Sequence, residues 1–411
     1  MRIPVVMAVL LFAISILVDL YIFFDIRRNS GGRKGFPLTY AALSAACWIF
    51  LAVCIFRPRR DLDTGITFQM WGLYAYLTVY FPKIIFSLFS ILGGFPHLWR
   101  RKPLRLGLWL GLPLAIMVFA AMWWGTAVTR NRIEVKKVEI TSPKIPAGFD
   151  GYRIMQISDL HVGTRGDDTG FISEFVDSMN AQKPDVIFFT GDIVNRETGE
   201  LSPFLNILSR LEAPAGVYSI LGNHDYGDYL DWDQPEEKVE NLQLLKNWQR
   251  QIGWKLLNNE SAFLVSKEDT IPLIGVENWG EPPFHQYGHL LDAFPIEKTK
   301  TRHLNDSTFK ILLTHNPEHW RREVTQISNI DLTLSGHTHA MQTVFSLGGI
   351  RWSPSAWRYE QWGGLYEKEN PRGEKMKIYV NTGAGEVGMP YRIGVPPEIT
   401  LITLRSTSKK K

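Results

Sequence analysis

The sequence predicts a membrane-anchored α/β protein, in which about four transmembrane helices within residues 1–130 precede a layered α/β domain over residues 150–405. Three observations support this fold class. Long apolar stretches are confined to the first 130 residues. Short runs rich in β-branched and aromatic residues alternate with amphipathic stretches in the rest of the chain. The balance of charge also differs between the two parts.

The distribution of charged residues differs between the two parts of the chain and bears on whether the protein binds nucleic acid. The chain of 411 residues has a formal net charge of +4, but residues 1–130 hold 14 Lys and Arg against 4 Asp and Glu, which leaves 31 basic and 37 acidic residues in the larger part. Domains that bind nucleic acid concentrate basic residues in order to neutralise phosphates. The acidic balance of the larger part therefore argues against nucleic acid as a partner. Cys47 and Cys54 both lie in an apolar stretch and do not indicate a redox compartment.

Four apolar stretches in the first part predict the transmembrane helices. Residues 35–56 and 106–129 contain no charged residue, and each is long enough to cross a hydrocarbon core about 30 Å thick. The stretch within the first 24 residues is interrupted by Asp19, and the stretch over residues 64–94 is interrupted by Lys83 and the preceding proline. A single charge in a span can reach the headgroups or face other helices, so we expect four helices.

A cleaved signal peptide is the alternative interpretation of the first apolar stretch. No small-x-small cleavage site follows it, and three further apolar stretches would remain in the membrane. We therefore interpret the first stretch as a helix that is retained.

The basic residues that flank the four helices give only a weak indication of orientation. The two predicted hairpin loops, 25–34 and 95–105, hold eight Lys and Arg, and the opposite side also holds eight. Four of the latter begin the large domain, and basic residues of large domains contribute little to orientation. Without those four, the loops face the cytoplasm, and we expect the large domain to be extracytoplasmic.

The domain boundaries follow from changes in composition. Residues 131–149 are polar, contain Pro143 and Pro146, and are interpreted as a linker, whereas residues 406–411 form a short basic tail. Beyond the linker, short apolar runs typical of buried strands occur at 152–157, 186–190, 217–221, 309–314, 330–334, 378–380 and 399–404. Helix-like amphipathic stretches occur at 170–180, 201–211 and 236–251. This alternation predicts a layered domain with largely buried sheets.

Five of the predicted strands are followed at once by short motifs that contain Asp, His or Asn. In chain order the motifs are Ser158-Asp159-Leu160-His161, Gly191-Asp192, Gly222-Asn223-His224-Asp225, Thr314-His315-Asn316 and Ser335-Gly336-His337-Thr338-His339. Ligands of open α/β folds bind beyond the carboxyl ends of the strands, so these side chains are expected to converge. A lone Gly-Asp is usually a turn. Five such motifs in order, holding half of the ten histidines, favour a functional site.

The converging side chains suit divalent metal ions. Two carboxylates, an amide oxygen and several imidazoles form a mixed oxygen and nitrogen set that fits manganese, iron or zinc, and they are too many for a single ion. Asp159 and His161 can chelate one ion, and Asp192 can bridge to a second. The glycines 191, 222 and 336 are expected to let the backbone turn sharply beside the ions.

The ordered motifs resemble those of the calcineurin-like metallophosphoesterase superfamily, over roughly residues 150–404. The resemblance implies a four-layer αββα sandwich with two divalent metal ions at the strand ends. It also implies seven metal ligands: Asp159, His161 and His339 on the first metal, Asn223, His315 and His337 on the second, and Asp192 shared.

The resemblance further implies catalysis. His224 is similar to the family's histidine that protonates the leaving oxygen, and Asp225 is expected to orient it. The implied function is hydrolysis of a phosphomonoester, phosphodiester or pyrophosphate by attack of a metal-bridging hydroxide. A membrane sensor or scaffold whose metal domain binds a phosphoryl ligand without turnover is the alternative. A lost ligand or a lost acid would favour that alternative, and no motif position is lost here.

Two aromatic stretches bear on the substrate. One includes Trp279 and Phe284, and the other includes Trp352 and Trp357. These side chains could cover the sheets or seat the domain at the bilayer interface, where Trp is common. They could instead line a groove for the apolar part of a lipid phosphate or lipid pyrophosphate. The run Gly-Ala-Gly-Glu-Val-Gly at 383–388 matches a dinucleotide fingerprint, but a proline follows where a helix should begin, so we interpret it as a turn that borders the metal site.

Overall fold

The fold is that of a computed structural model, which describes residues 5–56, 64–96, 102, 104–166, 168–282, 284–293 and 308–407. The chain forms two compact units. One comprises Met1–Val128 with Gly388–Tyr391, and the other comprises Thr129–Val387 with Arg392–Lys411. Residues 408–411 of the predicted basic tail, and several of the arginines counted for orientation, lie outside the described residues.

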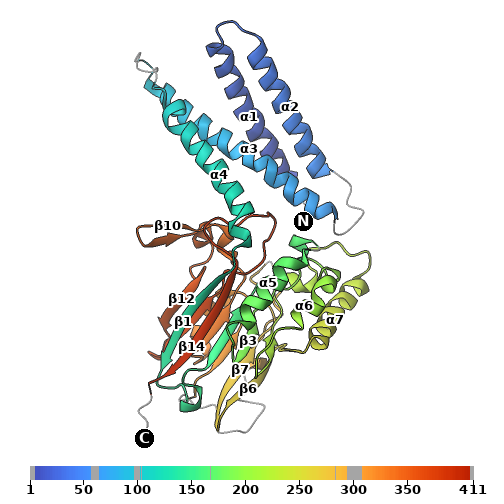
Figure 1. The fold of residues 1–411 in the computed structure, drawn as a ribbon, viewed down its shortest axis with the longest axis vertical. Helices are drawn as coiled ribbons and strands as arrows, with labels where there is room; N and C mark the ends of the chain where they lie inside the picture. The colour runs from blue at the N-terminus through green and yellow to red at the C-terminus, as the bar shows by residue number, and fades with distance from the viewer. Residues whose placement is uncertain are drawn as a thin grey trace. The chain divides into compact units, whose positions relative to one another are not determined.

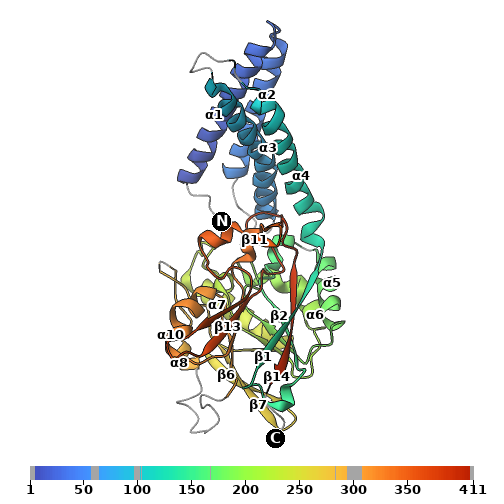
Figure 2. The ribbon, with the colours of Figure 1, turned by 90° about the vertical axis from the view of Figure 1, so that its left-hand side faces the viewer.

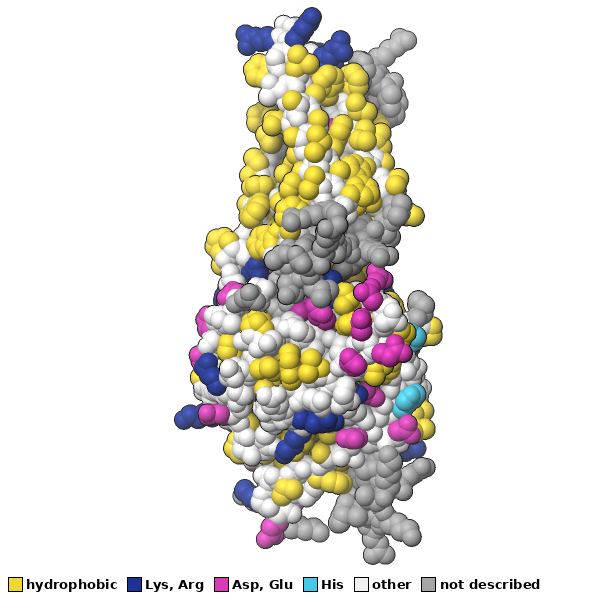
Figure 3. Space-filling model, turned by 90° about the vertical axis from the view of Figure 1, so that its right-hand side faces the viewer, with side chains coloured by type: hydrophobic (Ala, Val, Ile, Leu, Met, Phe, Trp, Pro, Cys, Tyr) yellow, Lys and Arg dark blue, Asp and Glu magenta, His cyan; other side chains and the backbone are white. Residues whose placement is uncertain are grey.

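The first unit is helical. Its elements are α1 (Val5–Asn29), α2 (Gly35–Phe56), α3 (Thr64–Gly94), the π-helical turn η2 (Gly107–Gly111) and α4 (Leu112–Ala127), which are drawn in blue to cyan in Figure 1. Four spans, Val6–Asn29, Gly35–Phe56, Thr67–Gly94 and Gly107–Asn131, are long and apolar enough to cross a membrane. Hydrophobic side chains cover the helical face seen in Figure 3. The prediction of four membrane helices is confirmed.

The two charges that interrupt the predicted helices pair with each other. Asp19 of α1 is buried, and its carboxylate accepts a hydrogen bond from Nζ of Lys83 of α3 at 2.9 Å. The same carboxylate accepts hydrogen bonds from the hydroxyls of Tyr40 and Tyr80 at 2.5 and 2.6 Å and from the indole of Trp48 at 2.9 Å. A buried charge is tolerated in an apolar setting when it is paired and fully hydrogen-bonded. Asp19 therefore faces the other helices.

The second unit contains two six-stranded sheets. The first has the strand order β1 (Glu134–Ser142), β14 (Glu398–Ser406), β2 (Arg153–Ile157), β3 (Val186–Phe189), β4 (Val217–Ser219) and β5 (Trp254–Leu256). The second has the order β12 (Gly364–Glu369), β13 (Lys375–Val380), β9 (Leu332–Ser335), β8 (Ile311–Leu313), β7 (Asp269–Gly275) and β6 (Glu260–Ser266). Strands β2 to β5 pair in parallel, as do β13, β9, β8 and β7.

The apolar cores show that the domain has four layers. Inward-facing residues of both sheets, such as Ile154, Phe188 and Leu332, form one continuous core between them. A second core joins the first sheet to α5 (Thr169–Asn180), α6 (Leu205–Leu208) and α7 (Pro235–Gln251), which lie together in Figure 1. A third joins the other sheet to α8 (Leu290–Ala293) and to the π-helical turn η8 (Trp320–Val324). The turn η8 lies between α9 (Pro317–His319) and α10 (Thr325–Ile327), and α8 and α10 are labelled on the same side in Figure 2. The predicted four-layer αββα sandwich is confirmed.

Helix α5 shows how the sequence specifies a layer. Asp168 is the N-cap and accepts a hydrogen bond from the backbone N–H of Gly170. Phe171, Phe175 and Met179 recur every four residues, and all are buried against the first sheet.

Two local predictions differ from the structure. About half of the segment 131–149, interpreted as a linker, is strand β1, which pairs in parallel with β14 along its whole length. As an edge strand, β1 tolerates the charged residues that suggested a linker. The predicted helix over 201–211 is instead a 3₁₀ segment (Thr198–Phe204) followed by the short α6, because Pro203 cannot donate a backbone hydrogen bond inside an α-helix.

Candidate metal centre

The predicted ligands lie at the carboxyl ends of five parallel strands. Asp159 and His161 follow β2, Asp192 follows β3 and Asn223 follows β4, whereas His315 follows β8 and both His337 and His339 follow β9. The two sheets thus bring these side chains to one place. Three groups have ligand atoms that lie within 4.8 Å of one another: Asp159 with His161 and His339, His161 with Asp192 and His224, and Asp192 with His315 and His337.

The distances between ring nitrogens and carboxylate oxygens suit shared cations. Nε2 of His339 lies 3.1 Å from Nε2 of His161 and 3.1 Å from Oδ1 of Asp159. Oδ2 of Asp192 lies 3.1 Å from Nε2 of His315 and 3.5 Å from Nε2 of His161. Asp192 therefore lies between two groups of histidines, as a bridging ligand would.

Asn223 and His337 complete the second group. The amide oxygen of Asn223 lies 3.1 Å from Nε2 of His315, and Nδ1 of His337 lies 3.2 Å from the same nitrogen. In the described part of the chain, Nδ1 of His161 is a buried nitrogen without a hydrogen-bond partner. Such a concentration of nitrogen and oxygen lone pairs fits divalent metal ions.

Five of the seven predicted ligands have a backbone conformation that sequence analysis did not anticipate. Their φ angles are positive: 54° for Asp159, 41° for His161, 60° for Asp192, 75° for His337 and 48° for His339. Positive φ is uncommon for residues with a Cβ atom and costs on the order of 1–3 kcal/mol at each position. Such strain persists where the surrounding structure imposes it, and it clusters at functional sites.

Two of the three glycines expected at sharp turns are instead required by close packing. Gly222 has φ −99° and is extended, and a Cβ atom there would lie 2.2 Å from Oδ1 of Asp192. A Cβ atom at Gly336 would lie 1.9 Å from Oγ of Ser158 and 2.3 Å from Oδ2 of Asp159. Of the three glycines, Gly191 has a positive φ, of 94°, which glycine adopts without strain.

In three of the histidine rings, one nitrogen contacts another group of the protein. Nδ1 of His315 lies 2.8 Å from the carbonyl oxygen of Thr190, and Nε2 of His337 lies 2.9 Å from the hydroxyl of Tyr359. Nδ1 of His339 lies 3.4 Å from the guanidinium of Arg392, which is fully buried. A carbonyl or hydroxyl oxygen that accepts the ring N–H fixes the orientation of a metal-binding ring and leaves the other nitrogen directed into the site. The guanidinium of Arg392 can only donate, so its contact restricts the position of the His339 ring without accepting a proton from it.

The electrostatics favour ionised carboxylates beside neutral imidazoles. Burial lowers the pKa of His161 to about 4, and burial together with the nearby His315 lowers the pKa of His337 to about 3. Burial opposes ionisation of Asp159, but His339 and His161 hold its pKa well below the usual range. Two charged carboxylates and two neutral rings are the protonation states that metal binding requires.

His315 behaves differently from the other rings. Burial alone would lower the pKa of His315, but the carboxylate of Asp192 outweighs it and raises this pKa to about 9. A divalent cation bound between the two side chains would take the place of that proton.

His224 lies beside the predicted ligands, and neighbouring groups of the protein hold its ring in place. Its Nδ1 lies 2.6 Å from the carbonyl oxygen of Asn195, and its ring stacks on Tyr229 with centroids 4.3 Å apart. Its backbone N–H donates to Oδ1 of Asp192 at 2.8 Å. The ring thus has one nitrogen bound and the other free to face the site.

Asp225 does not orient His224, contrary to expectation. Its buried carboxylate accepts hydrogen bonds from the backbone N–H groups of Asp192, Ile193 and Gly222 at 2.8 to 2.9 Å. A carboxylate satisfied by backbone donors joins the loops after β3 and β4. Asp225 therefore positions the ligand-bearing loops, and the carbonyl of Asn195 orients His224.

Glu200 supports the segment that holds His224. Its Oε2 accepts a hydrogen bond from the backbone N–H of Asn195 at 2.6 Å and from that of Arg196 at 3.3 Å. Burial raises the pKa of Glu200 to about 7. In the unfolded chain this pKa is about 4.3.

The raised pKa of Glu200 predicts a pH-dependent contribution to stability. A group whose pKa is higher in the folded state contributes stability that is complete at low pH and is lost as the pH rises through the folded pKa. We expect Glu200→Gln, which keeps the accepting oxygen, to be more stable than the wild type at pH 8 by on the order of 1–3 kcal/mol, with no such advantage at pH 4. Thermal unfolding across this range measures the difference. The exposed Glu212→Gln is the matched control, and a difference between wild type and Glu200→Gln that does not change with pH would contradict the assignment.

The four aromatic residues predicted to line a substrate groove do not share one environment. Trp279 is buried, its indole donates to Glu323 at 2.7 Å, and its ring stacks on His319, so it belongs to the protein interior. Phe284 is exposed. Trp352 and Trp357 contact each other, with ring centroids 5.3 Å apart.

The glycine-rich run at 383–388 borders the metal centre. The backbone N–H of Gly385 donates to the carbonyl of Asp159 at 2.7 Å, and that of Ala384 donates to the carbonyl of Ser158 at 3.1 Å. Glu386 pairs with Arg165 at 2.7 Å and with Arg130 at 3.3 Å. The run therefore supports the loop that carries the first two ligands.

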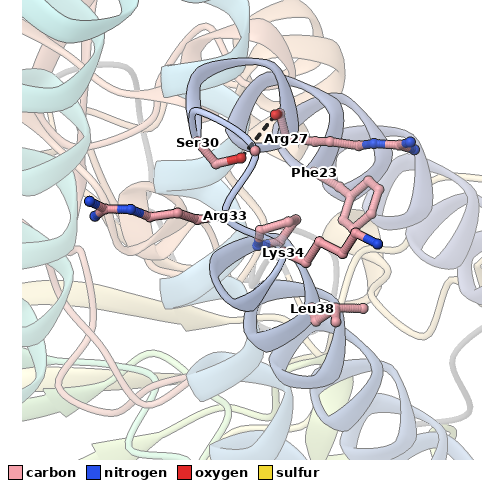
Figure 4. Close-up of a pocket in the computed structure, with 8 residues that line it drawn as sticks. Phe23, Arg27, Ser30, Arg33, Lys34 and Leu38 are labelled. Carbon is pink, nitrogen blue, oxygen red and sulfur yellow. Dashed lines mark hydrogen bonds between the residues drawn. The ribbon is translucent and has the colours of Figure 1, made fainter.

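A separate cavity lies in the helical unit, at the turn between α1 and α2. It has a volume of about 400 Å³ and is lined by Phe23, Arg27, Arg33 and Lys34 among others. Figure 4 shows the side chains of Arg27 and Arg33 extending in opposite directions. These cations do not converge on one point, so the cavity does not form a compact anion site.

Several residues that contact the predicted site residues could not be identified from the sequence. Asn195, Glu200, Tyr229 and Arg392 lie outside the strand-end motifs, and only their contacts reveal them. Tyr359 belongs to an aromatic stretch, but its contact with His337 could not be read from its position in the sequence.

Comparison with known proteins gives two family matches and several relatives. Residues 152–341 match the family described as calcineurin-like phosphoesterase, and residues 1–130 match the family described as probable calcineurin-like phosphoesterase, transmembrane domain. The chain is 31% identical over 286 residues to the uncharacterised metallophosphoesterase YkuE of Bacillus subtilis, which covers 68% of this chain and 87% of the relative.

Two other relatives are informative. A protein of Danio rerio described as a transmembrane protein with metallophosphoesterase domain is 27% identical over 424 residues, which covers 96% of this chain and 89% of the relative. The UDP-2,3-diacylglucosamine pyrophosphatase LpxG of Chlamydia muridarum is 28% identical over 313 residues, which covers 68% of this chain and 91% of that protein. The similarity to the Danio rerio protein thus includes both the helical and the sheet-containing units.

Proposed function

Because the chain belongs to the calcineurin-like phosphoesterase family and carries a four-helix transmembrane domain of the same group, we propose that it is a membrane-bound phosphoesterase with a dinuclear metal centre. The observation that supports this proposal is the meeting of two carboxylates, one amide and four imidazoles at the ends of five strands. A lost ligand would favour a sensor or scaffold, and every position of the predicted ligand set is occupied by a metal-binding residue type.

The ligand assignment follows from the distances. Asp159, His161 and His339 would hold one cation, whereas Asn223, His315 and His337 would hold the other. Asp192, whose Oδ2 lies near His161 and His315, would be shared. When bound, the two cations would supply Lewis acidity, lower the pKa of water and neutralise charge on a phosphoryl group.

His224 is proposed to protonate the leaving oxygen. The carbonyl of Asn195 accepts a hydrogen bond from Nδ1–H, so the proton that is transferred is the one that Nε2 carries in the imidazolium form of the ring. Stacking on Tyr229 and the backbone hydrogen bond to Asp192 restrict the movement of the ring. A leaving alkoxide would receive the proton from a ring that is already oriented.

The proposed substrate is a lipid-linked phosphoester or pyrophosphate. Four apolar helices place the protein in a bilayer, where lipid phosphates are present. The similarity to LpxG, a pyrophosphatase whose substrate name contains two acyl groups, supports the same class of substrate. We further propose that the catalytic domain is extracytoplasmic, because the basic hairpin loops favour the cytoplasmic side.

A substrate panel tests the proposed function. Full-length protein in detergent, purified and supplied with manganese, iron or zinc, is assayed on lipid phosphates, lipid pyrophosphates and water-soluble phosphoesters. We expect metal-dependent turnover of both kinds, with a higher kcat/KM for the lipid substrates. Chelation should abolish turnover of every substrate.

Two outcomes of the panel would contradict separate parts of the proposal. Higher kcat/KM for the soluble compounds would remove the lipid substrate but keep the hydrolase. Absence of hydrolysis of any phosphoester by the metal-loaded protein would remove the hydrolase and favour a binding role.

A further inference from the structure

Strands β10 (Phe345–Leu347) and β11 (Ile350–Trp352) form a hairpin of their own, outside the two large sheets. The pairing is antiparallel, with Phe345 opposite Trp352 and Leu347 opposite Ile350. Gly348 and Gly349 form the turn, with φ of 58° and 83°, which a two-residue hairpin turn requires. Figure 1 shows the hairpin projecting from the body of the domain.

One face of this hairpin is entirely apolar. Side chains alternate between the two faces of a strand, so the two apolar pairs lie on one face and the pair of Ser346 and Arg351 lies on the other. The rings of Phe345 and Trp352 stack with centroids 5.8 Å apart. The exposed fractions are 85% for Leu347 and 74% for Ile350, so the end of the apolar face is uncovered.

Trp357 enlarges the apolar face. Its ring contacts Trp352, and its exposed fraction is 81%. Arg351 lies on the opposite face of the hairpin, and Arg358, which follows Trp357, pairs with Glu281. A two-stranded hairpin in water gains little stability from its own pairing, and exposed apolar patches usually mark a surface that binds a partner or a membrane.

The hairpin is directly connected to the metal centre. It begins six residues after the ligand His339, and Ser353, which follows it, donates a hydrogen bond from Oγ to the carbonyl of Ala340 at 2.6 Å. Tyr359, two residues beyond Trp357, places its hydroxyl 2.9 Å from Nε2 of the ligand His337. The segment 339–359 thus joins the apolar face to two metal ligands.

The transmembrane helices of the same chain indicate a lipid bilayer as the partner of this face. Four helices cross a bilayer, and only six residues separate the end of α4 at Ala127 from the start of β1 at Glu134, at most about 20 Å of extended chain. The domain therefore works close to a lipid surface. Tryptophan, of which this face has two, is a residue that the membrane interface favours.

We propose that the apolar face formed by Phe345, Leu347, Ile350, Trp352 and Trp357 inserts into the bilayer interface and holds the metal centre beside the lipid from which the substrate leaves. This inference rests on the proposed function for its purpose, but insertion itself is independent of turnover. It assigns Trp352 and Trp357 to the membrane interface, and it identifies Leu347 and Ile350 as the deepest contacts.

A depth measurement tests insertion without any assay of activity. The single-cysteine variant Leu347→Cys, in a background of Cys47→Ala and Cys54→Ala, is labelled with an environment-sensitive fluorophore. The full-length protein is reconstituted into phosphatidylethanolamine and phosphatidylglycerol vesicles. The matched control is Val265→Cys in β6, an exposed apolar position on the second sheet.

The expected result is a blue-shifted emission at position 347 that is strongly quenched by nitroxide-labelled lipid, with a water-like emission and weak quenching at position 265. Equal quenching at the two positions, or a water-like emission at position 347, would overturn the inference.

A kinetic measurement separates this inference from the proposed function. We expect Leu347→Ser combined with Ile350→Ser to lower kcat/KM on a vesicle-borne lipid phosphoester about tenfold, mainly through KM, because the variant buries less apolar surface in the bilayer; this change corresponds to about 1.4 kcal/mol. Turnover of soluble p-nitrophenyl phosphate should be unchanged, which also shows that the variant folds. The control is Val265→Ser. Equal turnover of the lipid substrate by the variant and the wild type would contradict the inference. Absence of turnover by the wild type would contradict the proposed function instead.

Discussion

Replacing Asp192 with asparagine is expected to reduce phosphoester hydrolysis by about 10³-fold or more, since loss of a bridging carboxylate removes roughly 4 kcal/mol of stabilisation from the transition state. Asp192 is the carboxylate shared by two of the three groups of ligand atoms, and its Oδ2 lies 3.1 Å from Nε2 of His315 and 3.5 Å from Nε2 of His161. An amide keeps the shape of the side chain but carries no charge. Two cations would then repel each other across a neutral group.

Metal analysis and kinetics together check the expectation for Asp192. We expect the purified variant to retain at most one ion per chain where the wild type retains two. Asp168→Asn is the matched control, because Asp168 caps α5 and belongs to none of the groups of possible ligands, so the same chemical change should leave turnover and metal content intact. Undiminished turnover of Asp192→Asn would refute the assignment of a bridge.

Replacing His224 with alanine is expected to leave the metal content near that of the wild type and to reduce turnover by roughly 10²–10⁴-fold for substrates with basic leaving groups. The physical reason is that a poor leaving group departs only when it is protonated. Substrates such as p-nitrophenyl phosphate, whose leaving group is stable as an anion, should lose much less. The dependence of kcat on the pKa of the leaving group should therefore be steeper in the variant than in the wild type.

The metal content of the His224→Ala variant distinguishes between two possible roles of His224. His224 lies close enough to His161 and Asp192 to be counted in a group of possible ligands, so a direct role on a metal is the competing assignment. Loss of an ion from His224→Ala would establish that competing role. His285→Ala, which removes an exposed histidine outside the site, is the matched control.

The sequence contained most of the information about which residues form the centre. Strands such as β2 and β3 are short, apolar and buried on both faces, so their position and the polar residues that follow them were predictable. The parallel arrangement then placed the ends of the strands together. Because such strands are buried on both faces, they are short continuous apolar runs, which can be recognised from a few neighbouring residues of the sequence.

Other features depend on contacts between distant residues and could not be predicted. The carbonyl that orients His224 belongs to Asn195, and backbone carbonyls have no residue-specific signal. The resemblance implied that role for Asp225, but its carboxylate accepts hydrogen bonds from backbone donors of a neighbouring loop. Strand β1 was missed because its stability comes from pairing with β14, about 260 residues away, rather than from its own composition.

The pairing of Asp19 with Lys83 has a consequence for how the protein is made. The two residues are 64 positions apart, so α1 emerges from the ribosome well before the lysine that neutralises it. A lone carboxylate near the middle of a helix opposes entry into lipid by about 2.5–3.5 kcal/mol. The first helix is therefore expected to remain at the protein-conducting channel until α3 arrives, and the two helices leave it together as an electrically neutral pair.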